Sequence, residues 1–335
     1  MSDLNDVLVA QIAANGPLTV HDYMERSNTA YYAARDPLGA AGDFTTAPEI
    51  SQIFGELVGA WIADLWQRVG APARFRLIEL GPGRGTLMAD ALRASRHVPG
   101  FQDAALVTFV ETSPVLRAAQ AGIVPGADHA RSLADIPDDM PLIVIANEFF
   151  DALPVRQYGR GAGGWRELTV AAKDGRLARE PAPEHVREAC PAGEAIAAMA
   201  GARILRQGGA MLVIDYGYSG GEAGDTLQAV KAHRKIDPFA SPGTADLTAH
   251  VDFQALVNAA GTDVRAYGPV TQAAFLSALG IGVRAEALMR RADDAGRKII
   301  ASAVHRLTAP DQMGALFKVM ALVHPEWPPP AGFAV

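Results

Sequence analysis

Hydrophobic positions along this chain follow two alternating patterns. Short, continuous apolar runs are typical of strands buried on both faces, and longer segments repeat their apolar residues at helical spacing. The runs predict strands at Arg76–Leu80, Leu106–Val110, Leu142–Ala146, Ala210–Ile214 and Leu316–Val323. Helical patterns lie between most of them, so the sequence predicts an α/β fold with a mainly parallel sheet.

The segment before the first predicted strand is mostly helical. Helices are predicted from Leu4 to the stop at Gly16-Pro17, from near Thr19, and from Pro48 to Gln67. The aromatic, glycine-rich stretch from Tyr31 to Pro48 has no period and predicts a long loop. Long loops in compact domains are often functional.

Two segments interrupt the alternation. Val155 to about Arg179 predicts antiparallel strands with turns at 159–164 and 173–175, and Tyr216 to about His250 predicts a long loop or an irregular insertion. We therefore expect an N-terminal helical cap and candidate active-site loop over residues 1–55. A main domain over residues 56–335 carries insertions at about 155–200 and 217–250.

The end of the chain returns to regular patterns. Val251–Ala260 is a predicted helix with Gly261 as its stop, Asp263–Tyr267 is a predicted strand, and two helices follow. Pro328–Pro330 predicts an extended and poorly ordered tail.

Composition narrows the class of protein. The chain has 335 residues, 49% of them hydrophobic, which is enough for a large core, and its net charge of −7 argues against nonspecific binding to nucleic acid. A single cysteine, Cys190, excludes an internal disulfide and a multi-cysteine zinc site. The acidic start, Met1–Asp6, does not resemble a signal or transit peptide, and no apolar run approaches the roughly 20 residues that span a bilayer. We expect a soluble, cytoplasmic protein.

The most informative motif is Glu79-Leu80-Gly81-Pro82-Gly83-Arg84-Gly85-Thr86, between a predicted strand and a predicted helix. Gly81, Gly83 and Gly85 allow backbone conformations and a close ligand approach that a Cβ would obstruct. A dinucleotide fingerprint requires glycine where Thr86 stands, and a phosphate loop requires a lysine that is missing here. The remaining pattern is that of class I S-adenosylmethionine methyltransferases. A glycine-rich turn without a ligand is the alternative.

Two acidic residues at strand ends suit this cofactor. S-adenosylmethionine carries an ammonium group, a ribose and a sulfonium but no phosphate. Glu79 is placed to reach the ammonium directly or through water. Glu111 follows the next strand, where an acid can hydrogen-bond both ribose hydroxyls. A solvent-facing carboxylate is the alternative for Glu111.

The third predicted strand ends in Asn147-Glu148-Phe149-Phe150-Asp151, at the edge that faces the transferred methyl group in this fold. Asn147, Glu148 and Asp151 are therefore candidate catalytic residues, and Asn147 is also a candidate cofactor contact. If the acceptor is an arginine guanidinium, which stays protonated at neutral pH, Glu148 and Asp151 are the carboxylate pair that would orient it. A helix N-cap is the alternative for Asp151, and a buried Glu148 requires a partner.

Asp215 and Tyr216 end the following strand at the same edge and are candidate lining of the acceptor pocket; an Asx-type turn with aromatic packing is the alternative. The polar residues beyond them do not show the i, i+4 histidine spacing of a helical zinc site. Helix capping suffices for Asp246 to Asp252. No metal is expected.

Together these segments resemble the MidA family, S-adenosylmethionine-dependent methyltransferases related to the mitochondrial complex I assembly-factor arginine methyltransferase. The matching blocks extend over almost the whole chain: Tyr31-Tyr32, Gly42–Glu56, Glu79–Leu87, Asn147–Pro154, Asp215–Gly217, His233-Arg234, Asp246–Phe253 and Gly314–Met320.

The resemblance implies a class I, Rossmann-like methyltransferase fold with a mostly parallel seven-stranded sheet, S-adenosylmethionine as cofactor and a protein arginine acceptor. In mitochondrial relatives the acceptor is an arginine of a peripheral-arm subunit of NADH:ubiquinone oxidoreductase (complex I), dimethylated symmetrically during assembly. The resemblance also suggests that the Gly42–Pro48 loop, with Asp43, Phe44 and Thr45, closes over cofactor and acceptor. Without a mitochondrial presequence, the chain is expected to be a bacterial, cytoplasmic member.

Two other functions stay open at this point. The first is a cofactor-binding assembly partner that holds a complex I subunit with little or no turnover, because a cofactor motif indicates binding and not catalysis. The second is a nicotinamide-dependent oxidoreductase, against which Thr86 counts. The sequence leaves the acceptor arginine, the degree of methylation and the oligomeric state open, a homodimer included.

Overall fold

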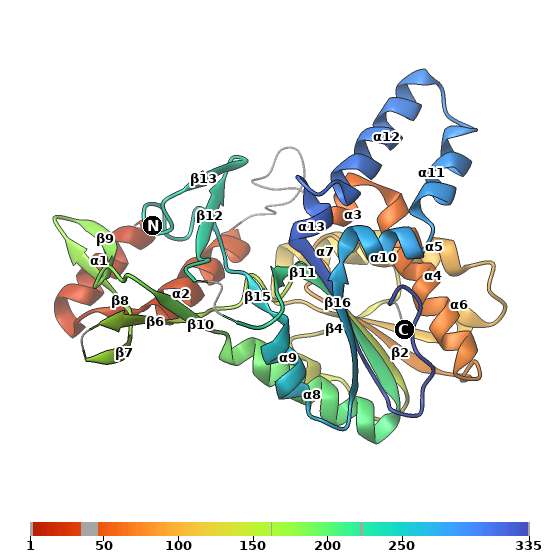
Figure 1. Cartoon of the computed structure of the whole chain (residues 1–335), viewed down its shortest axis with the longest axis horizontal. Coiled ribbons are helices and arrows are strands. Elements are labelled where there is room, and N and C mark those ends of the chain that lie inside the picture. Colours follow the sequence, from red (N-terminus) through yellow and green to blue (C-terminus); the bar gives the residue numbers. More distant parts are fainter. Residues whose placement is uncertain (1–2, 35–45, 162, 222–223, 334–335) are drawn as a thin grey trace.

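The computed structural model describes residues 3–34, 46–161, 163–221 and 224–333. Its largest element is a central sheet whose strands follow the order β16-β17-β11-β5-β2-β3-β4, with β15 added beside β11 (Figure 1). The strands are β2 (Phe75–Leu80), β3 (Ala105–Val110), β4 (Asp128–Ala130), β5 (Leu142–Asn147), β11 (Gly209–Tyr218), β15 (Val251–Asp252), β16 (Arg265–Thr271) and β17 (Phe317–Val323).

Strands β11, β5, β2, β3 and β4 are parallel, β17 runs antiparallel to β11, and β16 runs antiparallel to β17. The predicted α/β fold with a mostly parallel sheet is therefore confirmed. The carboxyl ends of the parallel strands meet at one edge, where ligands of such sheets bind.

Helices cover both faces of this sheet, which explains why its central strands β2 and β5 are buried along their whole length. Successive residues alternate between two hydrophobic clusters: Leu77 belongs to one and Ile78 to the other, and Leu212 and Val213 divide in the same way. The first cluster includes α4 (Gln52–Arg68), α5 (Thr86–Ser95), α6 (Phe101–Ala104), α10 (Gln272–Ala278), α11 (Ile281–Met289) and α12 (Asp294–Thr308). The second includes α8 (Pro191–Gln207) and α9 (Phe253–Ala260).

A second lobe lies to one side of the central sheet (Figure 1). It has its own hydrophobic cluster, to which Leu8, Tyr23, Val170 and Leu247 contribute. Its elements are α1 (Leu4–Asn15), β1 (Leu18–Thr19), α2 (Val20–Ala34), β6 (Arg156–Gly161), β7 (Gly164–Glu167), β8 (Thr169–Lys173), β9 (Arg176–Glu180), β10 (Val186–Ala189), β12 (Gln228–Lys231), β13 (Arg234–Ile236) and β14 (Asp246–Thr248).

The N-terminal helices thus pack on strands from both predicted insertions. These strands form three small sheets, β1-β8-β9, β10-β6-β7 and β13-β12-β14. The antiparallel strands predicted from Val155 are present, and the turn at 173–175 has the left-handed residues Asp174 and Gly175 that such hairpins require. The division into residues 1–55 and 56–335 stays a prediction.

Several element predictions were wrong. The segment from Tyr216 to His250 is not irregular, because it extends β11 to Tyr218 and then forms β12, β13 and β14. The helix predicted from Pro48 is interrupted at Ser51, which adopts an extended conformation and caps α4 by accepting a hydrogen bond from the Ile53 N–H. It leaves a short α3 (Ala47–Ile50) before the break.

The end of the chain also differs from its prediction. Val251 and Asp252 pair with β11, and the helix starts only at Phe253, where Asp252 caps it. Four helices follow β16 in the described chain where two were predicted: α10, α11, α12 and the short α13 (Met313–Leu316). The helix α7 (Pro114–Ile123) and a 3₁₀ turn (Leu133–Asp135) complete the described fold.

The predicted disordered tail is instead packed. The Trp61 indole donates a hydrogen bond to the Ala331 carbonyl, and Phe333 is buried against Phe275. Within the described ranges, none of the helices is both long and apolar enough to cross a membrane.

Candidate active site

The glycine turn leaves β2 and enters α5 with a backbone that requires glycine. Gly81, Gly83 and Gly85 all have positive φ, between +55° and +86°. A Cβ on Gly81 would lie 2.7 Å from Cδ2 of Phe149, so this position has no room for a side chain. The turn therefore brings bare backbone to the carboxyl edge of the sheet.

Glu79 belongs to β2, two residues before Gly81, and lines the same cavity as the glycine turn. The residue is 3% exposed, and its Oε2 has no hydrogen-bond partner among the described residues. Burial raises the pKa of Glu79 to about 8. A cationic group in the cavity would satisfy this oxygen and return the carboxyl to its ionised form.

Glu111 follows β3 and also lines the cavity. Its Oε1 accepts hydrogen bonds from the backbone N–H groups of Thr112 and Ser113, both at 2.7 Å. These bonds fix the carboxylate at the strand end, so the residue is oriented by its own turn. Burial raises the pKa of Glu111, and those N–H groups oppose the rise.

Gln120 was not predicted, and it holds the glycine turn in place. This fully buried residue of α7 donates from Nε2 to the Gly83 carbonyl at 2.6 Å, and its Oε1 lies 2.9 Å from His129 Nε2. The only signal in the sequence is a polar residue on the apolar face of a helix, which does not identify its partner.

Asn147 ends β5 and Glu148 follows it. Together they connect the carboxyl end of this strand to α3. Oε1 of Glu148 accepts hydrogen bonds from the Ala47 N–H at 2.8 Å and from Asn147 Nδ2 at 3.1 Å. These are the partners that a buried Glu148 requires. Its φ of +49° is a strained conformation for a glutamate, and burial raises its pKa to about 7. Asn147 Oδ1 is buried without a partner among the described residues.

Asp151 and Asp215 differ in whether they reach the cavity. Asp151 lines the cavity in a turn, not at a helix start, and burial raises its pKa to about 6. Asp215 is fully buried and does not line the cavity, contrary to its prediction. Its Oδ2 accepts hydrogen bonds from the N–H groups of Phe149, Phe150 and Asp151 at 3.0–3.3 Å. Asp215 thus shapes the turn that presents Asp151.

Tyr216 lines the cavity, as predicted. Its ring packs edge-on against His250 and Phe317, with centroids 5.4 and 5.3 Å away. The other predicted loop residues, Asp43, Phe44 and Thr45, lie outside the described residues.

The cavity that Glu79, Glu111, Asp151 and Tyr216 line has a volume of about 1010 Å³. It reaches from the glycine turn to the second lobe. This volume lies at the top of the range for small-molecule sites, so it can hold a cofactor and a second reactant. Over the described residues its lining is acidic: the carboxylates are Glu25, Glu49, Glu79, Glu111, Glu148, Asp151 and Asp246, and the cations are Arg84, Arg131 and Lys235. Such a cavity favours cationic ligands.

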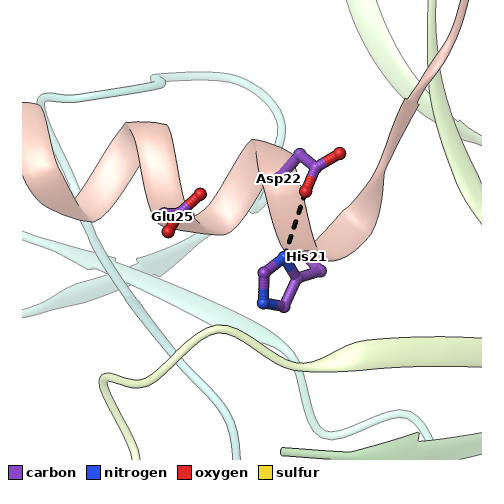
Figure 2. A group of neighbouring side chains, drawn as sticks. All are labelled: His21, Asp22 and Glu25. Atoms are coloured by element: carbon purple, nitrogen blue, oxygen red, sulfur yellow. Dashed lines mark hydrogen bonds and ion pairs between the residues drawn. The ribbon is translucent and has the colours of Figure 1, made fainter. Parts of the chain in front are cut away.

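One group of potential metal ligands lies at the start of α2. Ligand atoms of His21, Asp22 and Glu25 are within 4.8 Å of one another, and His21 Nδ1 is 3.1 Å from Asp22 Oδ1 (Figure 2). The histidine thus already has a carboxylate partner, and Glu25 is exposed. Nothing else at this surface points to a bound cation, and that no metal is needed stays a prediction.

The cavity suits S-adenosylmethionine in its volume and in its hydrogen-bond acceptors. The unpaired buried oxygens Glu79 Oε2 and Asn147 Oδ1 can accept hydrogen bonds, and the glycine backbone permits close approach. The cationic side chain of the turn, Arg84, forms an ion pair with Glu49, with 3.4 Å between Nη1 and Oε2.

Comparisons with known proteins agree with this site. Residues 57–270 match the model of an S-adenosyl-L-methionine-dependent methyltransferase family. The chain is 38% identical to the mitochondrial protein arginine methyltransferase NDUFAF7 homolog of Drosophila melanogaster over 94% of this chain and 83% of that protein. It is 34% identical to mitochondrial NDUFAF7 of Danio rerio over 95% of this chain and 86% of that protein.

Solved structures show the same relationship. A COG1565 superfamily member from Burkholderia thailandensis, bound to S-adenosyl-homocysteine, matches with a TM-score of 0.83 and 29% identity over 98% of this chain and 93% of that chain. The native structure of a COG1565 superfamily protein from the same organism matches with a TM-score of 0.77 and 28% identity, over 99% of this chain and 92% of that chain. The cofactor of this protein is S-adenosylmethionine, and the chain belongs to the MidA family of S-adenosylmethionine-dependent methyltransferases.

Proposed function

We propose that this methyltransferase is a protein-arginine N-methyltransferase. The observation that carries the proposal is the acidic cavity, in which Glu148 and Asp151 lie at the strand edge beside the cofactor turn. A guanidinium is a planar cation with five N–H donors, and buried carboxylates are its natural partners. The names of the curated relatives support the same acceptor.

We propose that Glu79, Glu111, Asn147 and the three glycines hold the cofactor. Glu79 offers its unpaired Oε2 to the ammonium group, and Glu111 faces the ribose. The backbone of Gly81, Gly83 and Gly85, which have no side chains, would allow the amino-acid tail of the cofactor to approach closely. When bound, S-adenosylmethionine supplies an electrophilic methyl group for an in-line displacement.

Glu148 and Asp151 act on the acceptor in this proposal. They orient the guanidinium and draw its positive charge toward the nitrogens that they contact, away from the nitrogen that attacks the methyl group. The attacking nitrogen thereby becomes a better nucleophile. Methylation releases one proton, and a carboxylate whose pKa burial has raised to about 6 or 7 is able to take it. Asn147 holds Glu148 in place through its side-chain hydrogen bond.

The finer parts of the function follow the same proposal. The acceptor protein is a peripheral-arm subunit of complex I, methylated symmetrically during assembly in the cytoplasm.

Labelled-methyl transfer tests this function. The protein is incubated with labelled S-adenosylmethionine and the complex I peripheral-arm subunits of its own organism, and mass spectrometry identifies the modified residue. We expect label on an arginine. Label on another residue type would contradict the arginine proposal. Confirmed cofactor binding without any transfer would favour an assembly partner that holds its client without turnover.

A further inference from the structure

The small sheet β13-β12-β14 presents one polar face to the active-site cavity. Gln228 pairs with Thr248 and Val230 pairs with Asp246, and all four residues line the cavity. The alternate residues Ala229 and Leu247 point the other way, into the core of the second lobe. We call the four cavity-lining residues the acceptor face.

The acceptor face is held against the reaction edge by buried hydrogen bonds. The Ala249 N–H donates to the Asp151 carbonyl at 2.9 Å, which places Thr248 next to the turn of Asp151. The Asn28 side chain from α2 donates to the carbonyls of Ala152 and Leu247 and accepts from the Leu247 N–H. The face is therefore a fixed wall of the cavity.

Thr248 has an unused polar group on this wall. It is 4% exposed, and its Oγ1 has no hydrogen-bond partner among the described residues. The neighbouring Tyr216 does not supply one: burial raises the Tyr216 pKa and Thr248 opposes that rise, yet no hydrogen bond joins Thr248 Oγ1 to a described residue. A buried hydroxyl that lacks a partner costs stability, so a ligand is expected to supply one.

We propose that Thr248 and its cross-strand partner Gln228 determine acceptor specificity by hydrogen-bonding the guanidinium of the acceptor arginine. This inference rests on the proposed function. Asp151 and Thr248 lie beside each other on the wall, and a planar guanidinium has donors on two sides that can reach both. A lysine ammonium presents its three donors from a single nitrogen and lacks this planar fork, so it matches the spacing of the two acceptors less well. A buried polar group that the wrong substrate leaves unpaired weakens the binding of that substrate, so such groups discriminate effectively between substrates.

The test compares two degenerate peptide libraries, with a central arginine or a central lysine, as acceptors for labelled methyl transfer. Thr248→Val keeps the shape of the side chain and removes its hydroxyl. We expect KM for the arginine library to rise about tenfold, with the dissociation constant for S-adenosylmethionine unchanged. Thr248→Ser restores the hydroxyl and should recover most of the affinity. Gln228→Leu should also raise KM.

Thr262→Val is the matched control, because Thr262 is exposed in the turn after α9 and outside the cavity. Thermal unfolding of each variant verifies its fold. Arginine methylation with unchanged KM in both Thr248→Val and Gln228→Leu would overturn this inference and leave the proposed function intact. Transfer to the lysine library alone, or to neither library, would overturn the proposed function and the inference with it.

Discussion

Glu79 is a carboxyl group that burial alone keeps largely neutral at pH 7, since its pKa rises to about 8. A raised folded-state pKa gives a stability that is fully present below the unfolded pKa and is lost as pH rises through the folded one. The free protein should therefore lose stability between about pH 5 and pH 8.

Glu79→Gln removes the titrating carboxyl group, so the variant should lose less stability over this pH range than the wild type does. Between pH 5 and pH 8 the free energy of unfolding of the wild type should fall by on the order of 4 kcal/mol more than that of the variant. Chemical denaturation at both pH values, without cofactor, measures the difference. Glu184→Gln, at an exposed carboxylate, is the control and should follow the wild type. Equal slopes for Glu79→Gln and the wild type would show that Glu79 is not a buried acid.

Gly81 tests the cofactor turn. Gly81→Ala places a Cβ 2.7 Å from Phe149 in a backbone with φ of +60°, so it should cost about 1–3 kcal/mol of stability. It should also weaken cofactor binding, measured by titration calorimetry. Gly122→Ala is the control, because it adds a Cβ in open space on α7. An unchanged affinity in Gly81→Ala would place the cofactor elsewhere.

For single residues, the sequence predicted positions that backbone geometry determines and missed side chains whose roles depend on tertiary packing. The glycines were identified because few other residues adopt their positive φ. Gln120 was missed because its role depends on a carbonyl of the glycine turn, 37 positions earlier in the chain. The orientation of Asp215 beneath the turn also depends on contacts that a strand-end position does not reveal.

Among the elements, α2 connects the second lobe to the active site. Asn28 is 6% exposed and makes three hydrogen bonds to backbone groups of Ala152 and Leu247. Asn28→Ala would leave these buried groups without partners. We expect a loss of about 2–4 kcal/mol in the free energy of unfolding.

Denaturant unfolding measures this loss, and Asn258→Ala is the control. Asn258 is exposed on α9, where its only described side-chain bond is to Gln254, so its change should stay within about 0.5 kcal/mol. A similarly small effect of Asn28→Ala would mean that α2 is not held by this residue.

The strands β2, β3, β5, β11 and β17 were predictable because each is a nearly continuous apolar run, whereas the short β4 and β15 were not predicted. The sheet β13-β12-β14 was not predicted either, because its strands are only three or four residues long and the polar residues Gln228, Asp246 and Thr248 interrupt their apolar signal. The helix break at Ser51 was also missed, since its extended backbone lies within an otherwise helical pattern.

For the whole molecule, cofactor binding should raise stability by mass action. At a concentration 100 times its dissociation constant, S-adenosylmethionine should add about 2.7 kcal/mol to the free energy of unfolding, and NAD at the same concentration should add nothing. Thermal unfolding with each ligand tests this, and Gly83→Val should abolish the effect. Stabilisation by NAD alone would contradict the choice of cofactor.

The fold class, the cofactor and the family followed from motifs spread over the chain, whereas the packing of its ends did not. The C-terminal segment reads as a proline-rich tail, but Ala331 and Phe333 contact α4 and α10. The hydrogen bond between Trp61 and Ala331 joins residues 270 positions apart, and nothing in the local sequence indicates it.

The three hydrogen bonds of Asn28 have a consequence for how acceptor preference can change. They link an N-terminal helix, the turn after β5 and a strand of a later insertion, so no one of these segments is an independent module. Transplanting the β12–β14 segment from a relative without its matching α2 should give a protein that binds cofactor but has a misaligned acceptor wall. Retargeting this enzyme therefore requires exchanging all three segments together.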